Sequence, residues 1–199
     1  MKIESTVKQE QIVEAAIRRF SHFGITKTTL TEIAEDLAVS KQSLAYYFPD
    51  KQSLVMAVED KISSDYIDNL RSGIILAASV EQALMKLSEI KIAFFEKYFM
   101  LAMQAEHIEH ASGRSLTSWK QKLSKQEIEL LVPLFERGVQ QGEIKPLDAA
   151  KTAELFLDTL HAFSRCIKDK GAFPQPDAFK EILTKQQEVI ALFYKGLKK

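Results

Sequence analysis

The stretch TTLTEIAEDLAVSKQSLAYYFPDK, residues 28–51, decides the fold and predicts two short helices joined by a tight turn. Thr29 and Glu32 have the S/T-x-x-E spacing of a capping box, which begins a helix by satisfying its free N–H groups. Apolar residues then form a narrow helical face, at Ile33, Ala34 and Leu37. The small residue Ala38 permits a sharp reversal, after which Ser40 can cap the second helix.

The second short helix has the composition of a DNA-reading helix. In a helix-turn-helix, the first residues of the second helix reach base edges in the major groove, and here they are Lys41, Gln42 and Ser43, with Tyr46 one turn later. A glutamine can bond adenine in bidentate fashion, and a lysine can reach guanine. Three further residues are expected to hold phosphates and fix the register: Thr29, Tyr47 and Lys51.

Helical hairpins are common in all-α proteins, so the flanking pattern matters. Ahead of the hairpin, Ile12, Ala15, Ala16, Phe20 and Phe23 follow a helical rhythm that Gly24 ends. Residues 8–54 resemble the N-terminal domain of the TetR family of bacterial transcriptional regulators. The matching residues are Ala16, Phe20, Gly24, Thr28, Thr29, Ile33, Ala34, Val39, Ser40, Lys41, Ser43, Leu44, Tyr46, Tyr47, Phe48, Lys51 and Leu54. Ala45 departs, because the family most often has tyrosine there, so the family's contact from that position is not carried over.

The composition is that of an ordinary globular protein, with 46% hydrophobic and 27% charged residues in 199. Twenty-seven basic residues balance 27 acidic ones, which predicts modest non-specific DNA affinity and strong salt sensitivity. The single cysteine, Cys166, excludes an internal disulfide and suits a reducing cytoplasm, and a small buried hydrophobe is favoured over a redox switch. No apolar run approaches the ~20 residues of a membrane span, and the polar start MKIES does not have the apolar core expected of a signal peptide.

The rest of the chain has helical periodicity and no strand pattern, so we predict an all-α fold. Helices are expected at residues 50–77, at 80–110 with a break near Phe99, at 116–123, at 124–142, at 147–170 and at 176–197. A second capping-box pattern, Ser124 to Glu127, would open the fourth of these, and Pro133 predicts a kink or a broken turn inside it. We expect a three-helix DNA-binding domain at residues 1–49 and a ligand-binding and dimerisation domain at residues 50–199.

The last two helices are too apolar for one packed face each. Their stripes are Phe156, Leu160, Phe163, Ile182, Val189 and Phe193, with Leu155, Ala162, Leu192 and Leu197 beyond or beside them. Two core helices of one domain would explain this pattern, and so would pairing with a second copy. The resemblance favours a homodimer, because TetR proteins typically dimerise through two C-terminal helices. A two-fold dimer would give each recognition helix one half-site of a palindromic operator.

Aromatic residues and methionines gather in the middle of the chain. Ordinary core packing is one reading of them, and an adaptable cavity for a small apolar molecule is the other. We expect this ligand site at Phe95, Phe99, Met103, His107, Trp119 and Phe156. His107 and His110 have a spacing that would permit a metal ligand pair, but no wider signature supports a metal, and no cofactor is expected.

The chain shows no nucleophile elbow, glycine-rich phosphate loop, HExxH or CxxC pattern, so we expect no enzyme. The expectation is a sequence-specific transcriptional regulator, a repressor that an apolar ligand releases from its operator. The ligand would favour a conformer whose recognition helices do not match the operator, with helix 50–77 as the lever. An all-α lipid or small-molecule carrier is the alternative, and it leaves the basic residues Lys41 to Lys51 unexplained.

Overall fold

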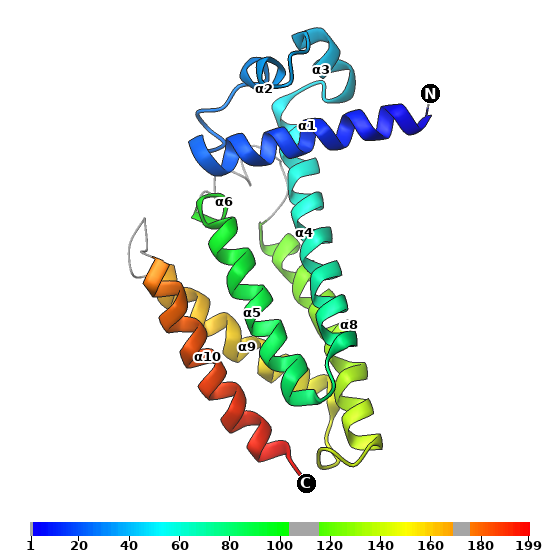
Figure 1. Ribbon diagram of the computed structural model, residues 1–199, viewed down its shortest axis with the longest axis vertical. Coiled ribbons are helices and arrows are strands. Elements are labelled where there is room, and N and C mark those ends of the chain that lie inside the picture. Colours follow the sequence, from blue (N-terminus) through cyan, green and yellow to red (C-terminus); the bar gives the residue numbers. More distant parts are fainter. Residues whose placement is uncertain (1, 104–115, 169–175) are drawn as a thin grey trace. The chain divides into compact units, whose positions relative to one another are not determined.

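The computed structural model describes residues 2–103, 116–168 and 176–199 (Figure 1). Within them it contains α1 Lys2–Phe23, α2 Leu30–Asp36, α3 Lys41–Tyr47, α4 Lys51–Leu76, α5 Val80–Lys97, α6 Phe99–Met103, α8 Leu116–Gln140, α9 Ala149–Lys168 and α10 Pro176–Leu197. The only extended pairing among these residues is an isolated bridge between Ile144 and Lys198. The predicted all-α class is confirmed.

The chain divides into two compact units. One comprises residues 1–64 and 98–119, and the other comprises residues 65–97 and 120–199. The border runs through α4, so that the first turns of this helix belong to one unit and its remaining turns to the other. The functional division predicted between residues 49 and 50 stays a prediction.

The first unit has a small core built from several short apolar faces. Phe20 of α1, Ile33 of α2, Leu44 of α3 and Leu54 of α4 are among its fully buried side chains. Helix α2 contacts both α1 and α3, and α6 packs against α1 (Figure 1). Burial from four helices fixes the two short ones, which are too short to be stable alone.

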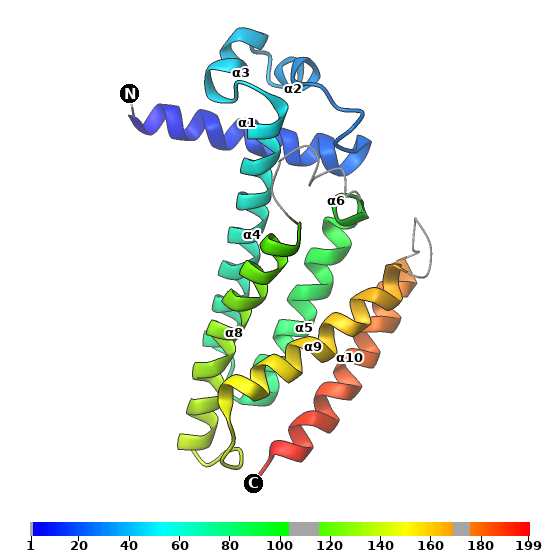
Figure 2. The same cartoon turned by 180° about the vertical axis from the view of Figure 1, so that it is seen from behind.

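The second unit has a larger core, in which α10 contacts both α5 and α9. Helix α9 crosses α5 at an angle (Figure 2). The fully buried side chains include Leu70, Leu84, Leu87, Leu131, Phe135, Ile144, Phe156, Leu157, Leu160 and Ile190. Three polar residues, Ser88, Glu127 and Gln186, are buried in the described part of the same unit.

Most predicted helix limits are confirmed. Helix α4 ends one residue before the predicted limit, α10 matches residues 176–197, and the predicted break near Phe99 lies at Tyr98, between α5 and α6. Gly24 ends α1 with a φ of 84°, a left-handed conformation that suits glycine, and its N–H donates to the Phe20 carbonyl. The loop predicted after residue 110 lies outside the described residues.

The predicted border at Ser124 is wrong, because α8 is continuous from Leu116 to Gln140. A capping box needs the carboxylate to turn back to the N-cap, but the Glu127 carboxylate is buried against Tyr66 and Lys91 instead. Pro133 breaks no turn: it lies on the exposed side of α8, and the helix continues through it.

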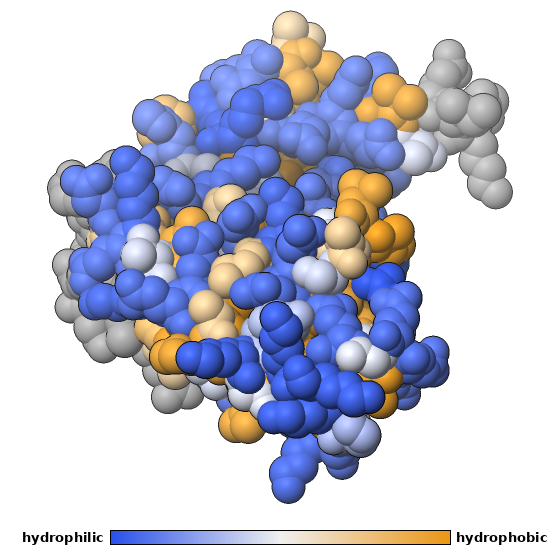
Figure 3. Space-filling model, turned by 60° about the horizontal axis from the view of Figure 1, so that its bottom comes forward, coloured by the Kyte–Doolittle hydropathy of each residue, from blue (hydrophilic) through white to orange (hydrophobic). Residues whose placement is uncertain are grey.

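No helix among the described residues is long and apolar enough to cross a bilayer. Figure 3 shows one face of the molecule, on which hydrophilic residues dominate and apolar residues form small separate groups. Larger exposed apolar side chains in the described residues are few, and those of α9 and α10 are Leu155 and Leu192.

Candidate DNA-binding surface

The loop between α1 and α2 is fixed by side chains of the predicted capping box. Glu32 accepts hydrogen bonds from the Thr29 N–H at 2.7 Å and from the Thr29 hydroxyl at 2.8 Å. The Thr29 oxygen in turn accepts from the Glu32 N–H at 3.3 Å. Buried Thr28 donates to the Gly24 carbonyl at 2.8 Å, so both ends of the loop are held. The predicted start of α2 is confirmed.

The turn between α2 and α3 is made by a residue with positive φ. Ala38 has a φ of 52°, and the Val39 N–H donates to the Ala34 carbonyl at 3.0 Å to close the turn. Ser40 then caps α3, because its hydroxyl accepts from the Ser43 N–H at 3.1 Å. The left-handed conformation costs an L-residue roughly 1–2 kcal/mol, because Cβ approaches the following carbonyl oxygen.

Replacing Ala38 by glycine is therefore expected to stabilise the protein by about 0.5–1 kcal/mol, after the larger entropy of the unfolded glycine is counted. Ala38→Val should destabilise it, because a β-branched residue tolerates this conformation poorly. Thermal or urea unfolding of both variants measures the difference. Equal stabilities of the glycine and valine variants would contradict the assigned turn conformation.

Helix α3 presents a polar face to solvent. Leu44 is completely buried and anchors the helix, whereas Lys41, Gln42 and Tyr46 are exposed, with Tyr46 at 81%. Positions i, i+1, i+4 and i+5 share a helical face, so partly exposed Ala45 lies on the same face as these three. Its methyl group leaves room beside Gln42, where the resemblance would place a tyrosine ring.

Tyr46 and Tyr47 pack edge to face, with ring centroids 5.1 Å apart. Tyr47 is partly covered, as is Ser43, whose N–H is bound by the cap of the helix. The predicted reading residues of α3 are thus together on one short element. Whether each contacts a base or a phosphate stays a prediction.

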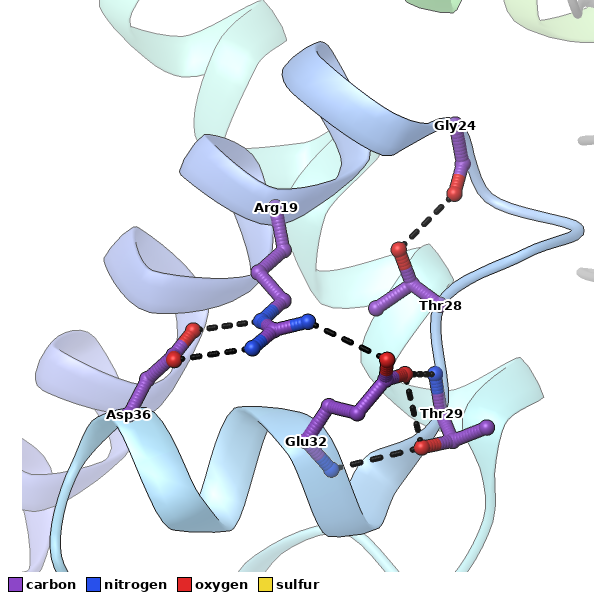
Figure 4. Close-up of polar contacts among 6 residues, drawn as sticks. All are labelled: Arg19, Gly24, Thr28, Thr29, Glu32 and Asp36. Atoms are coloured by element: carbon purple, nitrogen blue, oxygen red, sulfur yellow. Dashed lines mark hydrogen bonds and ion pairs between the residues drawn. The ribbon is translucent and has the colours of Figure 1, made fainter.

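An arginine of α1 holds both ends of α2 (Figure 4). Arg19 donates from Nε and Nη2 to the two carboxylate oxygens of Asp36, at 2.5 and 2.9 Å, and its Nη1 lies 3.3 Å from a Glu32 oxygen. Its guanidinium also lies over the Phe23 ring, 5.4 Å from the centroid. A two-pronged arginine pair fixes geometry better than a single ion pair does. Because α3 packs against α2, this arginine also helps to fix the position of α3 relative to α1.

The same contacts change the electrostatics of this surface. The hydrogen bonds and charge of Arg19 lower the pKa of Asp36, and those from Thr29, with the nearby Arg19 charge, lower the pKa of Glu32. Both groups are therefore ionised, and Arg19 offsets their charge. An unpaired carboxylate beside DNA would repel phosphates, so this pairing reduces a penalty that the acidic residues of α2 would otherwise impose.

Lys51 begins α4 and turns back toward the loop before α2. Its ammonium group donates to the Thr26 carbonyl at 3.4 Å, and partial burial lowers the pKa of the lysine. The Asp50 carboxylate caps α4 by accepting from the Ser53 N–H at 2.7 Å. The hydroxyl of Thr29 is already bonded to Glu32, so a phosphate contact from Thr29 would have to share that group.

The predicted ligand residues fall in different units. Phe99 and Trp119 belong to the first unit, where the Trp119 indole donates to the Ser63 hydroxyl at 3.0 Å. Phe95 and Phe156 belong to the second, where Phe95 packs on the Phe179 ring and Phe156 is buried against Phe193. The Met103 side chain and both His107 and His110 lie outside the described residues. The ligand site stays a prediction.

Three of the six residues predicted to contribute to the dimer interface need a correction, whereas Phe163, Val189 and Phe193 are partly buried and stay predictions. Phe156, Leu160 and Ile182 are buried within one chain, so a partner cannot cover them. Apolar periodicity alone does not distinguish the stripe that packs against a neighbouring helix of the same chain from the stripe outside it. Leu155 of α9 and Leu192 of α10 are 60% and 69% exposed, and they are the better candidates for a partner surface.

Sequence reasoning missed the role of Arg19 and the burial of Glu127. Arg19 has no local signal, because its partner Asp36 is 17 residues away. Glu127 does have one, since it precedes Leu131 and Leu134 at i+4 and i+7, which places a carboxylate on an apolar stripe.

Comparison with known proteins agrees with this surface. Residues 12–58 match the family described as bacterial regulatory proteins, tetR family. The HTH-type transcriptional regulator RutR of Escherichia coli K12 is 40% identical over 67 residues, and the chain spans only 32% of the length of that relative. The repressor KstR2 of Rhodococcus jostii RHA1 is 21% identical over 89% of this chain and 88% of its own.

Solved structures extend the likeness over the whole chain. A transcriptional regulator from Cytophaga hutchinsonii is 26% identical with a TM-score of 0.83, covering 96% of this chain and 99% of its own. A tetR-family regulator from Mesorhizobium loti has a TM-score of 0.79 at 21% identity, covers 98% of each chain, and thus supports the fold alone. The family match thus assigns residues 12–58 to the tetR family of bacterial regulatory proteins, and the solved structures show that the fold is shared over nearly the whole chain.

Proposed function

We propose that the protein is a sequence-specific transcriptional regulator that binds operator DNA through α3. The observation that carries this proposal is the exposed polar face of Lys41, Gln42 and Tyr46 on a helix anchored by buried Leu44. A helix of this kind fits the major groove, where amide and ammonium groups discriminate base edges. The relatives that share this region are named as transcriptional regulators. A cytoplasmic protein follows from this role.

The test is selection of duplexes from a random pool by the purified protein, followed by a mobility-shift assay with the selected sequence. A regulator should enrich a palindromic site and bind it far better than a scrambled duplex at the same salt concentration. The alternative, an all-α carrier of lipids or other small molecules, predicts no enrichment. That reading leaves the polar face of α3 without a role.

Replacing Gln42 by alanine is expected to change base preference at one position of each half-site by about 1–3 kcal/mol, because an adenine loses a bidentate partner. Lys51→Ala should instead weaken all duplexes alike and reduce the salt slope by about one, because it removes a phosphate contact. Binding of a panel of single-base variants of the operator measures both effects. The exposed glutamine Gln141, far along the chain in the second unit, provides the matched control Gln141→Ala.

Two results would contradict these roles. Unchanged affinity and preference in Gln42→Ala would exclude α3 from the groove. Loss of preference in Lys51→Ala would assign Lys51 to base reading. Because Lys51 also bonds the Thr26 carbonyl, its variant should be compared with wild type in thermal unfolding before binding is interpreted.

We infer further that the protein acts as a homodimeric repressor controlled by a small-molecule effector. Leu155 and Leu192 supply exposed apolar surface on the two C-terminal helices, and burial of such surface favours association. Helix α4 begins at Lys51, soon after the end of α3, and continues into the second unit. A conformational change in that unit can therefore alter the first turns of α4. We assign DNA binding to residues 1–49 and effector binding with dimerisation to residues 50–199.

Such coupling is reciprocal. An effector that weakens operator binding by a typical 1–3 kcal/mol, about 5- to 150-fold, must lose the same factor in its own affinity when operator is bound. Calorimetric titration of the effector with and without saturating operator measures this directly. Equal effector affinities in the two titrations would show that the bound molecule is not a signal.

A further inference from the structure

A buried carboxylate lies inside the second unit. Glu127 of α8 is 1% exposed, and its Oε1 accepts hydrogen bonds from the Tyr66 hydroxyl of α4 and from the Lys91 ammonium of α5. His161 of α9 approaches the other oxygen, with Nε2 3.5 Å from Oε2. We call Tyr66, Lys91, Glu127 and His161 the Glu127 cluster. It joins four helices of one unit.

The cluster holds its carboxylate ionised. Burial by itself would raise the pKa of Glu127, but the Lys91 charge and the hydrogen bonds from His161, Lys91 and Tyr66 outweigh it and lower that pKa to about 2. Burial and the neighbouring carboxylate raise the pKa of Tyr66 well above its ordinary value, so Tyr66 stays a hydrogen-bond donor. Glu127 is therefore surrounded by donors.

Stability alone is a poor explanation of this arrangement. Well-packed apolar residues can commonly replace a buried ion pair without loss of folding stability, because the cost of desolvating two charges offsets most of their attraction. Perturbed titratable groups that converge from several elements are, in contrast, common at binding sites. Most of the remaining described core of the unit is apolar, with Ser88 and Gln186 as its other buried polar residues, so the convergence of these four polar groups is specific to this position.

The cluster exposes its donors and hides its acceptor. The Lys91 side chain is 13% exposed and that of His161 is 38% exposed, whereas Glu127 behind them is closed to solvent. A molecule that reaches the cluster therefore meets an ammonium group and an imidazole. The complementary group on that molecule is a hydrogen-bond acceptor with negative charge, and a carboxylate matches both donors.

Apolar surface continues from the same site. Phe94 and Phe95 follow Lys91 at i+3 and i+4 on α5, so they lie one turn further on the same side of the helix, and both are only partly buried. The Phe94 ring contacts Tyr66 of the cluster, with centroids 5.3 Å apart. A ligand whose head meets Lys91 thus has an aromatic surface for an apolar body.

A second buried polar pair supports the position of His161. Gln186 of α10 accepts from the Ser88 hydroxyl at 2.6 Å and donates to the Leu160 carbonyl at 3.4 Å. Ser88 precedes Lys91 by three residues on α5, and Leu160 immediately precedes His161 on α9. These bonds tie the backbone beside His161 to the turn of α5 before Lys91, which fixes the spacing of the two donors.

From these observations we propose that Lys91 and His161, backed by Glu127, bind the carboxylate of an amphipathic molecule whose apolar body lies against Phe94 and Phe95. This inference rests on the proposed function, because it gives the effector its chemical class: an apolar molecule with one anionic head. An incoming carboxylate would compete with Glu127 for the Lys91 ammonium. It would thereby change the contacts of Glu127, which also accepts a hydrogen bond from Tyr66 of α4, the helix that begins at Lys51.

The test uses three probes that share one chain and differ in the head: octanoate, octan-1-ol and octylammonium. Calorimetry with the full-length protein should show octanoate binding at least about tenfold tighter than octan-1-ol, the worth of one charge-assisted hydrogen bond. Octylammonium should bind most weakly. The ratio of the octan-1-ol Kd to the octanoate Kd should fall towards one in two variants, His161→Gln and the double variant Lys91→Met/Glu127→Gln.

The double substitution is chosen because Lys91→Met alone would leave a buried carboxylate without its main partner and endanger folding. Lys86→Met is the matched control, since Lys86 is an exposed lysine of α5 that pairs with Glu89 at the surface. It should bind octanoate as wild type does. Tighter binding of octylammonium than octanoate, or a preference that survives both cluster variants, would overturn the proposal.

A purely structural cluster is also distinguishable. It predicts that the variants unfold more easily while wild type binds octanoate no better than octan-1-ol, and this result would overturn the proposal as well. Operator binding is measured on the same samples without probe. Wild type that binds operator but has no head-group preference refutes the carboxylate site alone. Wild type that prefers octanoate but selects no duplex refutes the regulator and leaves the site standing.

Discussion

Replacing Leu192 by glutamate is expected to convert the protein into a folded monomer that binds its operator at least about 100-fold more weakly, because linked half-sites gain about 10²–10⁴ in affinity. Leu192 is 69% exposed on α10, so within one chain the substitution buries no charge. Between two chains it would place an unpaired carboxylate in an apolar contact, which is costly. Leu155→Glu on α9 should act in the same way.

Sedimentation at micromolar concentration, with operator binding on the same samples, measures both consequences. Leu76→Glu is the matched control, because Leu76 is an exposed leucine at the end of α4, outside the two C-terminal helices. It should leave the dimer and its affinity unchanged. A wild-type protein that sediments as a monomer, or a Leu192→Glu variant that remains a dimer, would remove α10 from the interface.

The interface illustrates what apolar periodicity can predict. The pattern in residues 149–197 identified both helices and their apolar character, because period and length are local properties of the chain. It did not separate the stripe that packs inside the chain from the stripe beyond it. Phe156 and Leu192 are equally apolar in the sequence, yet one is buried and the other exposed, because only the neighbouring helices decide which side is covered.

Helix caps were likewise predictable only where their contacts are local. Thr29 and Ser40 were predicted correctly, because each bonds an N–H three residues later and needs no distant partner. The pattern at Ser124 has the same S/T-x-x-E spacing as Thr29 and Glu32 but begins no helix, because Tyr66 and Lys91, both more than 30 residues away, bind the Glu127 carboxylate. A local motif fails where a distant residue offers its side chain a better partner.

The residues of the candidate DNA-binding surface could be predicted from the sequence, but the contacts that hold their helices in place could not. Lys41, Gln42 and Tyr46 share a face because of helical spacing, which the sequence contains. The clamp by which Arg19 holds Asp36 and Glu32 joins two helices, and nothing in the spacing of these residues indicates it. Contacts between elements depend on packing angles that a single sequence does not display.

The Glu127 cluster leads to the second large effect, which concerns acid stability. The pKa of Glu127 is about 2 in the folded protein and 4.5 ordinarily, so the unfolded chain binds the proton more readily. The carboxylate therefore contributes its full stabilisation above about pH 4.5, and this contribution is lost as the pH falls towards 2. The gap between the two pKa values corresponds to roughly 3 kcal/mol of unfolding free energy.

Glu127→Gln is expected to be less stable than wild type by about 3 kcal/mol at neutral pH, because Lys91 keeps its buried position but loses its counter-charge. The difference should narrow as the pH falls from 4.5 towards 2, since wild type then loses the same charge. Urea unfolding across this pH range measures both quantities. Glu129→Gln, two residues further on α8 at an exposed position, is the control and should follow wild type.

The double variant Lys91→Met/Glu127→Gln separates charge from packing. If the cost of Glu127→Gln comes from an unpaired ammonium group, removal of that group as well should restore a large part of the lost stability. If the cost comes from packing, the double variant should be no better than the single one. Parallel acid profiles of wild type and Glu127→Gln would show that Glu127 is not ionised in the folded protein, because an ionised carboxylate with a depressed pKa must steepen the wild-type profile below pH 4.5.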